Sequence, residues 1–160
     1  MNRLAGIELL LLGMWLGAGL LVATVVAPAA FRVLPTRTLA GALVGQVLPV
    51  IFAAGLLIAI IAVGLEARMT RSPLRLAVTA PLAAMIIGCS VAQLVIAPKI
   101  DKVRASLGGP VDALPSMDPR RVQFGRLHGF SVLCLGVAML GAATAIGTRL
   151  LKADPSRSLY

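Results

Sequence analysis

Charged and aromatic side chains are scarce in this chain. Of its 160 residues only 13% are charged and 4% are aromatic, whereas 59% are hydrophobic. A soluble globular domain does not need so much apolar surface, and the mean hydropathy of +0.96 points the same way. The composition therefore excludes a soluble protein and indicates an integral membrane protein whose main partner is the lipid bilayer.

Histidine and cysteine, which carry much of the metal and acid–base chemistry of proteins, are also few. The chain has one histidine, His128, and two cysteines, Cys89 and Cys134, which form no paired motif. A zinc site needs three or four such ligands, and a catalytic triad would need a carboxylate near His128 and Ser131. We therefore predict no metal site and no catalytic residues, favour a protein that is not an enzyme, and interpret both cysteines as small packing residues.

Four long runs without charge dominate the chain. They hold between 22 and 28 residues each, and a helix needs about 20 residues to cross a bilayer. We predict an all-α bundle of four transmembrane helices within residues 1–150, for which two tandem helical hairpins are one arrangement. The predicted spans are about 4–31, 38–65, 74–98 and 121–148, with a longer polar connection over 99–120 and a polar tail over 151–160.

Further signals concern the ends of these spans. Ser72-Pro73 and Asp118-Pro119 are each a capping residue followed by proline, so they mark the expected starts of the third and fourth helices. Residues 99–107 can continue the third helix as an amphipathic helix with Ile100, Val103 and Leu107 on one face. Glu8 is expected near the surface that holds the termini.

The distribution of basic residues bears on partners and orientation. The net charge is +9, but the basic side chains lie at span ends, where they meet lipid phosphates, so we do not expect nucleic-acid binding. Seven basic residues fall on the side of the termini and eight on the other side. Because the larger group belongs mostly to the long connection and a projecting helix, we predict a multi-pass protein of the cell membrane with cytoplasmic termini.

Two short patterns recur along the chain. Residues 26–33 resemble residues 96–103 around a shared Ala-Pro pair, and Gly41–Gly45 resembles Gly125–Gly129. Each pattern occupies the same place in its hairpin, so the first two helices resemble the last two. Chance similarity in apolar sequence is the alternative explanation.

Polar side chains inside the spans gather in one half of the bundle. Counted at 1.5 Å per residue from the surface that holds the first and third connections, they lie at most roughly 12 Å deep. These candidate ligand-binding residues are His128, Ser131, Gln93, Ser90, Gln46 and Thr24. They can line a small polar pocket, or they can bond to one another and hold the helices together.

Small residues also mark a possible contact between chains. Gly13 and Gly17 are four residues apart in the first span, a spacing that lets another helix approach closely. The partner is either a helix of the same bundle or a second copy, so we predict a possible homo-oligomer through this pair.

Several segments together resemble the transmembrane protein 205-like family, a four-helix membrane domain of unknown function. The similarity rests on short elements from residue 5 to residue 147, and its most specific part is the run Leu127-His128-Gly129-Phe130-Ser131. Cys134 and Leu135 stand where such proteins often have asparagine. The resemblance implies a small multi-pass protein and no established reaction.

Three functions are compatible with these features. The leading hypothesis is a non-enzymatic binding or assembly module with a polar half-bundle around His128. The first alternative is a redox or haem b-binding membrane protein in which His128 is an axial ligand. The second is a small exporter or resistance protein.

Overall fold

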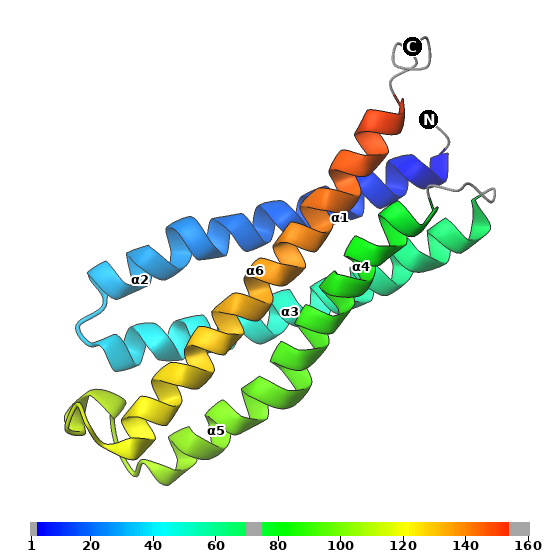
Figure 1. Cartoon of the computed structure of the whole chain (residues 1–160). Coiled ribbons are helices and arrows are strands. Elements are labelled where there is room, and N and C mark those ends of the chain that lie inside the picture. Colours follow the sequence, from blue (N-terminus) through cyan, green and yellow to red (C-terminus); the bar gives the residue numbers. More distant parts are fainter. Residues whose placement is uncertain (1–2, 70–74, 154–160) are drawn as a thin grey trace.

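The computed structural model describes residues 3–69 and 75–153, and these residues form a bundle of four long helical rods (Figure 1). The first rod joins three elements end to end, the second and fourth are single α-helices, and the third again joins three. In chain order the elements are α1 (Arg3–Leu21), the π-helical η1 (Val22–Val26) and α2 (Ala27–Val33), then α3 (Arg37–Arg68), then α4 (Arg75–Ser90), the π-helical η2 (Val91–Ile96) and α5 (Ala97–Ser106), and finally, after the 3₁₀ turn η3 (Val111–Ala113), α6 (Pro119–Ala153). This confirms the predicted all-α fold with four helices.

Each rod is long and apolar enough to cross a membrane. The four candidate spans have 31, 32, 31 and 33 residues, which at 1.5 Å per residue is roughly 46 to 50 Å. The hydrocarbon core is only about 30 Å thick, so the rod ends extend into the headgroup region. Only 22% to 33% of the most apolar stretch of each span is buried, and the rest is half-buried or exposed. The protein is therefore a multi-pass membrane protein.

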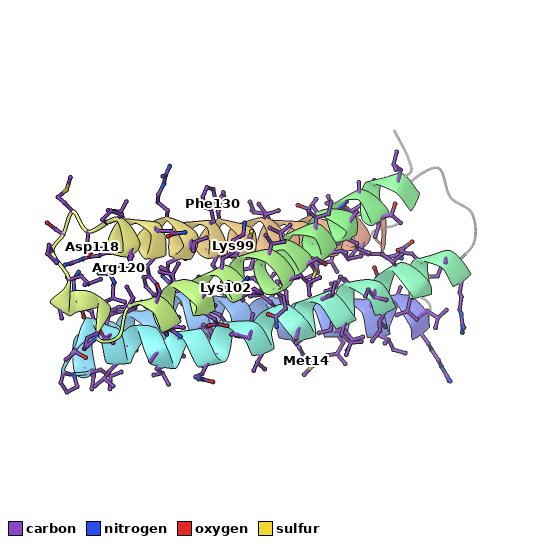
Figure 2. All side chains as sticks on the ribbon, turned by 90° about the horizontal axis from the view of Figure 1, so that it is seen from below. Met14, Lys99, Lys102, Asp118, Arg120 and Phe130 are labelled. Atoms are coloured by element: carbon purple, nitrogen blue, oxygen red, sulfur yellow. The ribbon has the colours of Figure 1, made fainter. Side chains whose placement is uncertain are left out.

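The rods form two hairpins in tandem. The start of α1 and the end of α6 lie at one end of the bundle, and the turns from α2 to α3 and from α5 to α6 lie at the other (Figure 1). Figure 2 shows Asp118 and Arg120 at this second end, and Met14 and Phe130 on opposite outer sides. Both of these apolar side chains are exposed, as expected for residues that face lipid.

The helix starts at the second end are fixed by side-chain caps. The Thr36 hydroxyl accepts a hydrogen bond from the Leu39 amide at 3.2 Å, and Asp118 Oδ1 accepts one from the Arg120 amide at 2.8 Å. Such caps satisfy amide groups that have no partner within the first turn of a helix. The expected Asp118-Pro119 start is confirmed, whereas the similar Ser72-Pro73 pair lies outside the described residues.

The core lies along the centre of the bundle and is rich in small residues. Its largest members include Leu12, Trp15, Phe52, Leu82 and Met85, packed beside buried alanines and Cys89. Alanine and glycine at these positions let the helices approach closely, and dispersion contacts replace the hydrophobic effect inside a bilayer. Cys89 therefore has the packing role that the sequence indicated, and Cys134 lies partly buried against the same core.

Gly13 and Gly17 do not contribute to this core. Both are exposed, and a β-carbon built on either would meet nothing within 4 Å. They face away from the other helices of the bundle, so they are not used for packing within it. A contact with a second copy through this face stays a prediction.

The two π-helical segments occupy matching places in the two hairpins. The Ala27 amide donates to the Val22 carbonyl, and the Ala97 amide donates to the Ala92 carbonyl. Each is a bond to the fifth residue back, and each alanine precedes a proline, Pro28 or Pro98. The sequence similarity between the hairpins is thus accompanied by the same irregularity in the backbone.

Candidate functional site

A cavity of about 560 Å³ opens at the end of the bundle that holds the two turns. It lies between α3 on one side and η2, α5 and α6 on the other, and Phe31 of α2 also borders it. Glycines line parts of its wall, namely Gly41 and Gly45 of α3 and Gly125 of α6. Since these residues have no side chains, space remains between helices that pack tightly further along the bundle.

Polar groups line the deeper part of this cavity. Gln93, His128 and Ser131 all border it, and Ser131 is buried. The amide oxygen of Gln93 is buried and accepts no hydrogen bond. A buried acceptor without a donor costs about 1–3 kcal/mol, so this oxygen is an unsatisfied polar atom on a residue that lines the cavity.

Gln93 belongs to the π-helical segment η2. A π turn widens the helix and changes the direction in which the following side chains point, and such turns are frequent at functional sites. The backbone irregularity of the third rod therefore coincides with the most conspicuous polar group of the cavity.

Three arginines, Arg37, Arg104 and Arg121, make the outer part of the cavity basic. The guanidinium group of Arg104 lies 5.8 Å from the ring centre of Phe124 on α6. A β-carbon on Gly45 of α3 would be 3.3 Å from Arg104 Nη2. Arg104 thus bridges α3, α5 and α6 at the opening, and its charge is held there by a cation–π contact.

Two aspartates, Asp101 and Asp112, also line the cavity. Asp112 Oδ2 accepts hydrogen bonds from the amide and the hydroxyl of Thr38, at 2.9 and 3.0 Å. Arg121 Nη1 donates to the Leu114 carbonyl at 2.7 Å. These bonds attach the connection after α5 to the starts of α3 and α6, so the polypeptide between α5 and α6 forms one wall of the cavity.

Apolar side chains complete the lining. Phe31, Leu48, Phe52, Ile100 and Phe124 contribute hydrocarbon surface between the basic opening and the polar interior. We name the whole site the basic cavity. Its charges suit an anionic group, its aromatic and aliphatic walls suit an alkyl chain, and its unpartnered amide suits a hydroxyl or amine.

The structure places the six candidate residues in different surroundings. His128, Ser131, Gln93 and Gln46 all line the basic cavity. Ser90 is half-buried and is not part of the lining. Thr24 is exposed, and its hydroxyl donates to the Leu20 carbonyl at 2.8 Å, so it also lies away from the cavity.

The residues that sequence reasoning missed are those of the opening. Arg104, Asp112 and Phe124 come from the connection after α5 or from the helix ends beside it. Residues 99–107 were expected to form an amphipathic helix with Ile100, Val103 and Leu107 on one face. Val103 and Leu107 are indeed buried, and that pattern was the only signal that Arg104 lies near the bundle.

Side chains that could bind a metal ion or haem iron are few among the described residues. Among residues 3–69 and 75–153, no three His, Cys, Asp or Glu side chains lie close enough to hold a metal ion. Within the described part of the chain, His128 borders the basic cavity, and no methionine, cysteine or second histidine does. The cavity therefore offers haem iron one axial ligand.

Comparison with known proteins supplies the family. The family described as Domain of unknown function (DUF4149) matches residues 10–107, which is more than half of the chain. The chain belongs to this family. The match covers most of the first rod and all of the second and third rods of this chain, and it ends before the Leu127–Ser131 element.

The family assignment supports the coarser part of the sequence-based expectation. A four-helix membrane domain of unknown function was predicted, and DUF4149 is a domain of unknown function. The match gives no support for the transmembrane protein 205-like name. No curated protein and no solved structure matches the chain.

Proposed function

We propose that this DUF4149 protein is a non-enzymatic binding module that holds a small anionic amphiphile in the basic cavity. The observation that carries the proposal is the buried Gln93 oxygen without a donor. In a membrane protein a polar group of this kind is costly unless another molecule satisfies it. A ligand hydroxyl or amine would do so.

The charged residues at the opening of the cavity favour a ligand with an anionic group at the end opposite its hydroxyl or amine. Arg37, Arg104 and Arg121 contribute three positive charges, and Asp101 and Asp112 contribute two negative ones. Since Asp112 is already hydrogen-bonded to Thr38, the arginines are left to bind a phosphate or carboxylate. The apolar walls between the opening and Gln93 would contact the alkyl part of the ligand.

A lipid comparison tests the proposal. Phosphatidylglycerol has a net negative charge and free hydroxyls. Phosphatidylcholine with the same acyl chains has neither, because its choline cation neutralises the phosphate and carries no hydroxyl. Phosphatidylglycerol is expected to raise the midpoint of thermal unfolding of the protein in mild detergent and to remain bound in native mass spectrometry. An equal response to both lipids would show that the protein only senses a general lipid environment.

Variants locate the binding. Arg104→Gln and Gln93→Leu are each expected to weaken binding about tenfold, which corresponds to about 1.4 kcal/mol. Arg126→Gln is the matched control for the first, because Arg126 is an exposed arginine of α6 outside the cavity lining. Thr24→Val is the control for the second. A loss that is as large in the controls would contradict binding in the basic cavity.

We infer further that the protein lies in the cell membrane with its termini in the cytoplasm. This orientation is supported by the distribution of basic residues along the connections, and it would make the basic cavity open toward the outer face. A reporter enzyme fused after the C-terminus, active only in the cytoplasm, tests it. An inactive fusion, together with activity of a second reporter that works only outside the cytoplasm, would contradict this orientation. The haem and exporter alternatives stay predictions.

A further inference from the structure

Three charged side chains meet at the end of the bundle opposite the basic cavity. Glu8 of α1, Glu66 of α3 and Arg149 of α6 are brought together there. Arg149 donates to Glu8 Oε2 through Nε at 3.0 Å and through Nη2 at 2.9 Å. Arg149 Nη2 also contacts Glu66 Oε1. We call Glu8 and Glu66 the acid pair, and we call the acid pair together with Arg149 the cluster.

All three side chains are removed from solvent. The exposed fraction is 0% for the Glu8 side chain, 5% for Glu66 and 16% for Arg149. Met69 lies beside them, with its sulfur 3.6 Å from Arg149 Nη2. Charged groups in such surroundings must neutralise one another closely, because water and its high dielectric constant are excluded.

The hydrogen bonds to Glu8 are incomplete. Both donors from Arg149 go to the same oxygen, Oε2, and the other oxygen, Oε1, is buried without a hydrogen-bond partner. Carboxylates in protein interiors usually have both oxygens satisfied. An ionised Glu8 would therefore carry charge density on an oxygen that nothing stabilises.

The charges of the described cluster do not cancel. Among the side chains that the structure describes at this end, two carboxylates face one guanidinium group, and Arg3 of α1 and Arg68 of α3 are exposed. The side chains of Arg75 and Lys152 lie outside the described part. Residues 76–90 of α4, whose side chains the structure describes, contain no charged residue. If both acids were ionised, these three described side chains would together carry one buried negative charge, and its desolvation is costly.

We propose that Glu8 and Glu66 together bind one proton at neutral pH, so that the acid pair and Arg149 are neutral as a group. The proton forms an O–H bond with one carboxylate oxygen, while the other carboxylate remains ionised and pairs with Arg149. Because the two acids share one arginine, the proton belongs to the pair rather than to one residue. This site is separate from the basic cavity and does not depend on its ligand.

Proton binding links the assembly of three helices to pH. With the proton bound, α1, α3 and α6 are joined by a neutral group of hydrogen bonds. When the proton leaves, two carboxylates compete for one guanidinium and repel each other. The folded protein is therefore expected to lose stability as the pH is raised far enough to remove the proton.

Infrared difference spectroscopy of the protein in detergent tests the proposal directly. At neutral pH the wild type is expected to show the C=O stretching band of a protonated carboxylic acid, shifted in heavy water and lost on alkaline titration. Glu8→Gln and Glu66→Gln should each remove the band, because the remaining carboxylate then pairs alone with Arg149. Asp118→Asn, which changes a carboxylate at the other end of the bundle, should keep it.

Two results of the infrared experiment would overturn the proposal. Absence of the band from the wild type at neutral pH would overturn the proposal, whatever the variants do. A band that persists in both glutamine variants would also overturn it, because it would come from another acid. Thermal unfolding gives a second readout: Glu8→Gln should reduce the loss of stability at alkaline pH, and an unchanged alkaline loss would contradict a shared proton.

Discussion

The indole ring of Trp15 lies directly against the backbone of Gly55 and leaves no room for a side chain at that position. A β-carbon built on Gly55 would be 2.7 Å from Trp15 Nε1 and Cε2, a distance that real atoms do not adopt. The same indole nitrogen donates to the Ile51 carbonyl at 2.8 Å. The first and second rods thus meet through one aromatic side chain and one bare stretch of helix backbone.

Gly55→Ala is expected to destabilise the protein by about 1–3 kcal/mol, because the indole must move and its hydrogen bond to Ile51 is strained. The midpoint of thermal unfolding in detergent measures the effect. Gly64→Ala on the same helix is the control, since a β-carbon there meets nothing within 4 Å. In a Trp15→Leu background the Gly55→Ala change should cost much less, and an undiminished cost would contradict the contact.

A second close approach joins α4 and α6. A β-carbon on Gly141 would lie 2.5 Å from the Pro81 carbonyl oxygen and 3.2 Å from the Met85 amide. These are backbone atoms, which cannot move aside independently of the helix. Gly141→Ala should therefore separate the helices and lower stability by about 1–3 kcal/mol. Gly136→Ala, at an open position of the same helix, should have little effect, and equal effects would refute the argument.

The cap of α6 predicts a pH dependence at the other end of the protein. Hydrogen bonds from the Arg120 side chain, and then from its amide, hold the pKa of the Asp118 carboxyl below its usual range. Because this pKa is lower in the folded protein than in the unfolded chain, the stabilisation is present above the unfolded value. It is lost as the pH falls through the lower, folded value.

Asp118→Asn keeps a capping oxygen but removes the charge and its titration. The wild type is therefore expected to unfold at a higher temperature than the variant at neutral pH, and the difference should disappear in acid. Thermal unfolding followed by circular dichroism across a pH series measures it. A difference that remains constant down to the lowest pH would show that the ion pair with Arg120 does not contribute.

Much of the fold could be predicted because the bilayer imposes simple requirements on sequence. Runs without charge had to be spans, and the capping signal at Asp118-Pro119 marked the start of α6 correctly. The continuation of the third rod to Ser106 follows a weaker signal, an amphipathic pattern among polar residues. Only three of its apolar side chains define that face.

The candidate site was harder to predict, because it depends on the rotation of each helix about its axis. Depth along the helix placed Gln93 and Thr24 at similar levels, but one lines the cavity and the other is exposed. Both lie in π-helical segments, where the usual 3.6-residue period does not hold. The sequence pattern assumed that period, so it could not distinguish the two.

The acid pair was missed for a related reason. Glu8 was recognised as a polar residue near one surface, but its partners Glu66 and Arg149 lie 58 and 141 residues away in the chain. Each of these residues by itself resembles an ordinary charge at the end of a span. Only the relative positions of three helices show that they meet.

The matched π-helical segments restrict where the length of this chain can change. A π turn holds one residue more than an α turn, so removing one residue from Val22–Val26 or Val91–Ile96 would let the helix return to α geometry while the later side chains keep their direction. Phe31 in the first rod and Arg104 in the third would then stay at the cavity. Removing one residue from an α-helical part of a rod would instead turn every later side chain by about 100°. Single-residue deletions among relatives should therefore be found in the π-helical segments or in the connection after α5, and should be absent from the α-helical parts of the rods.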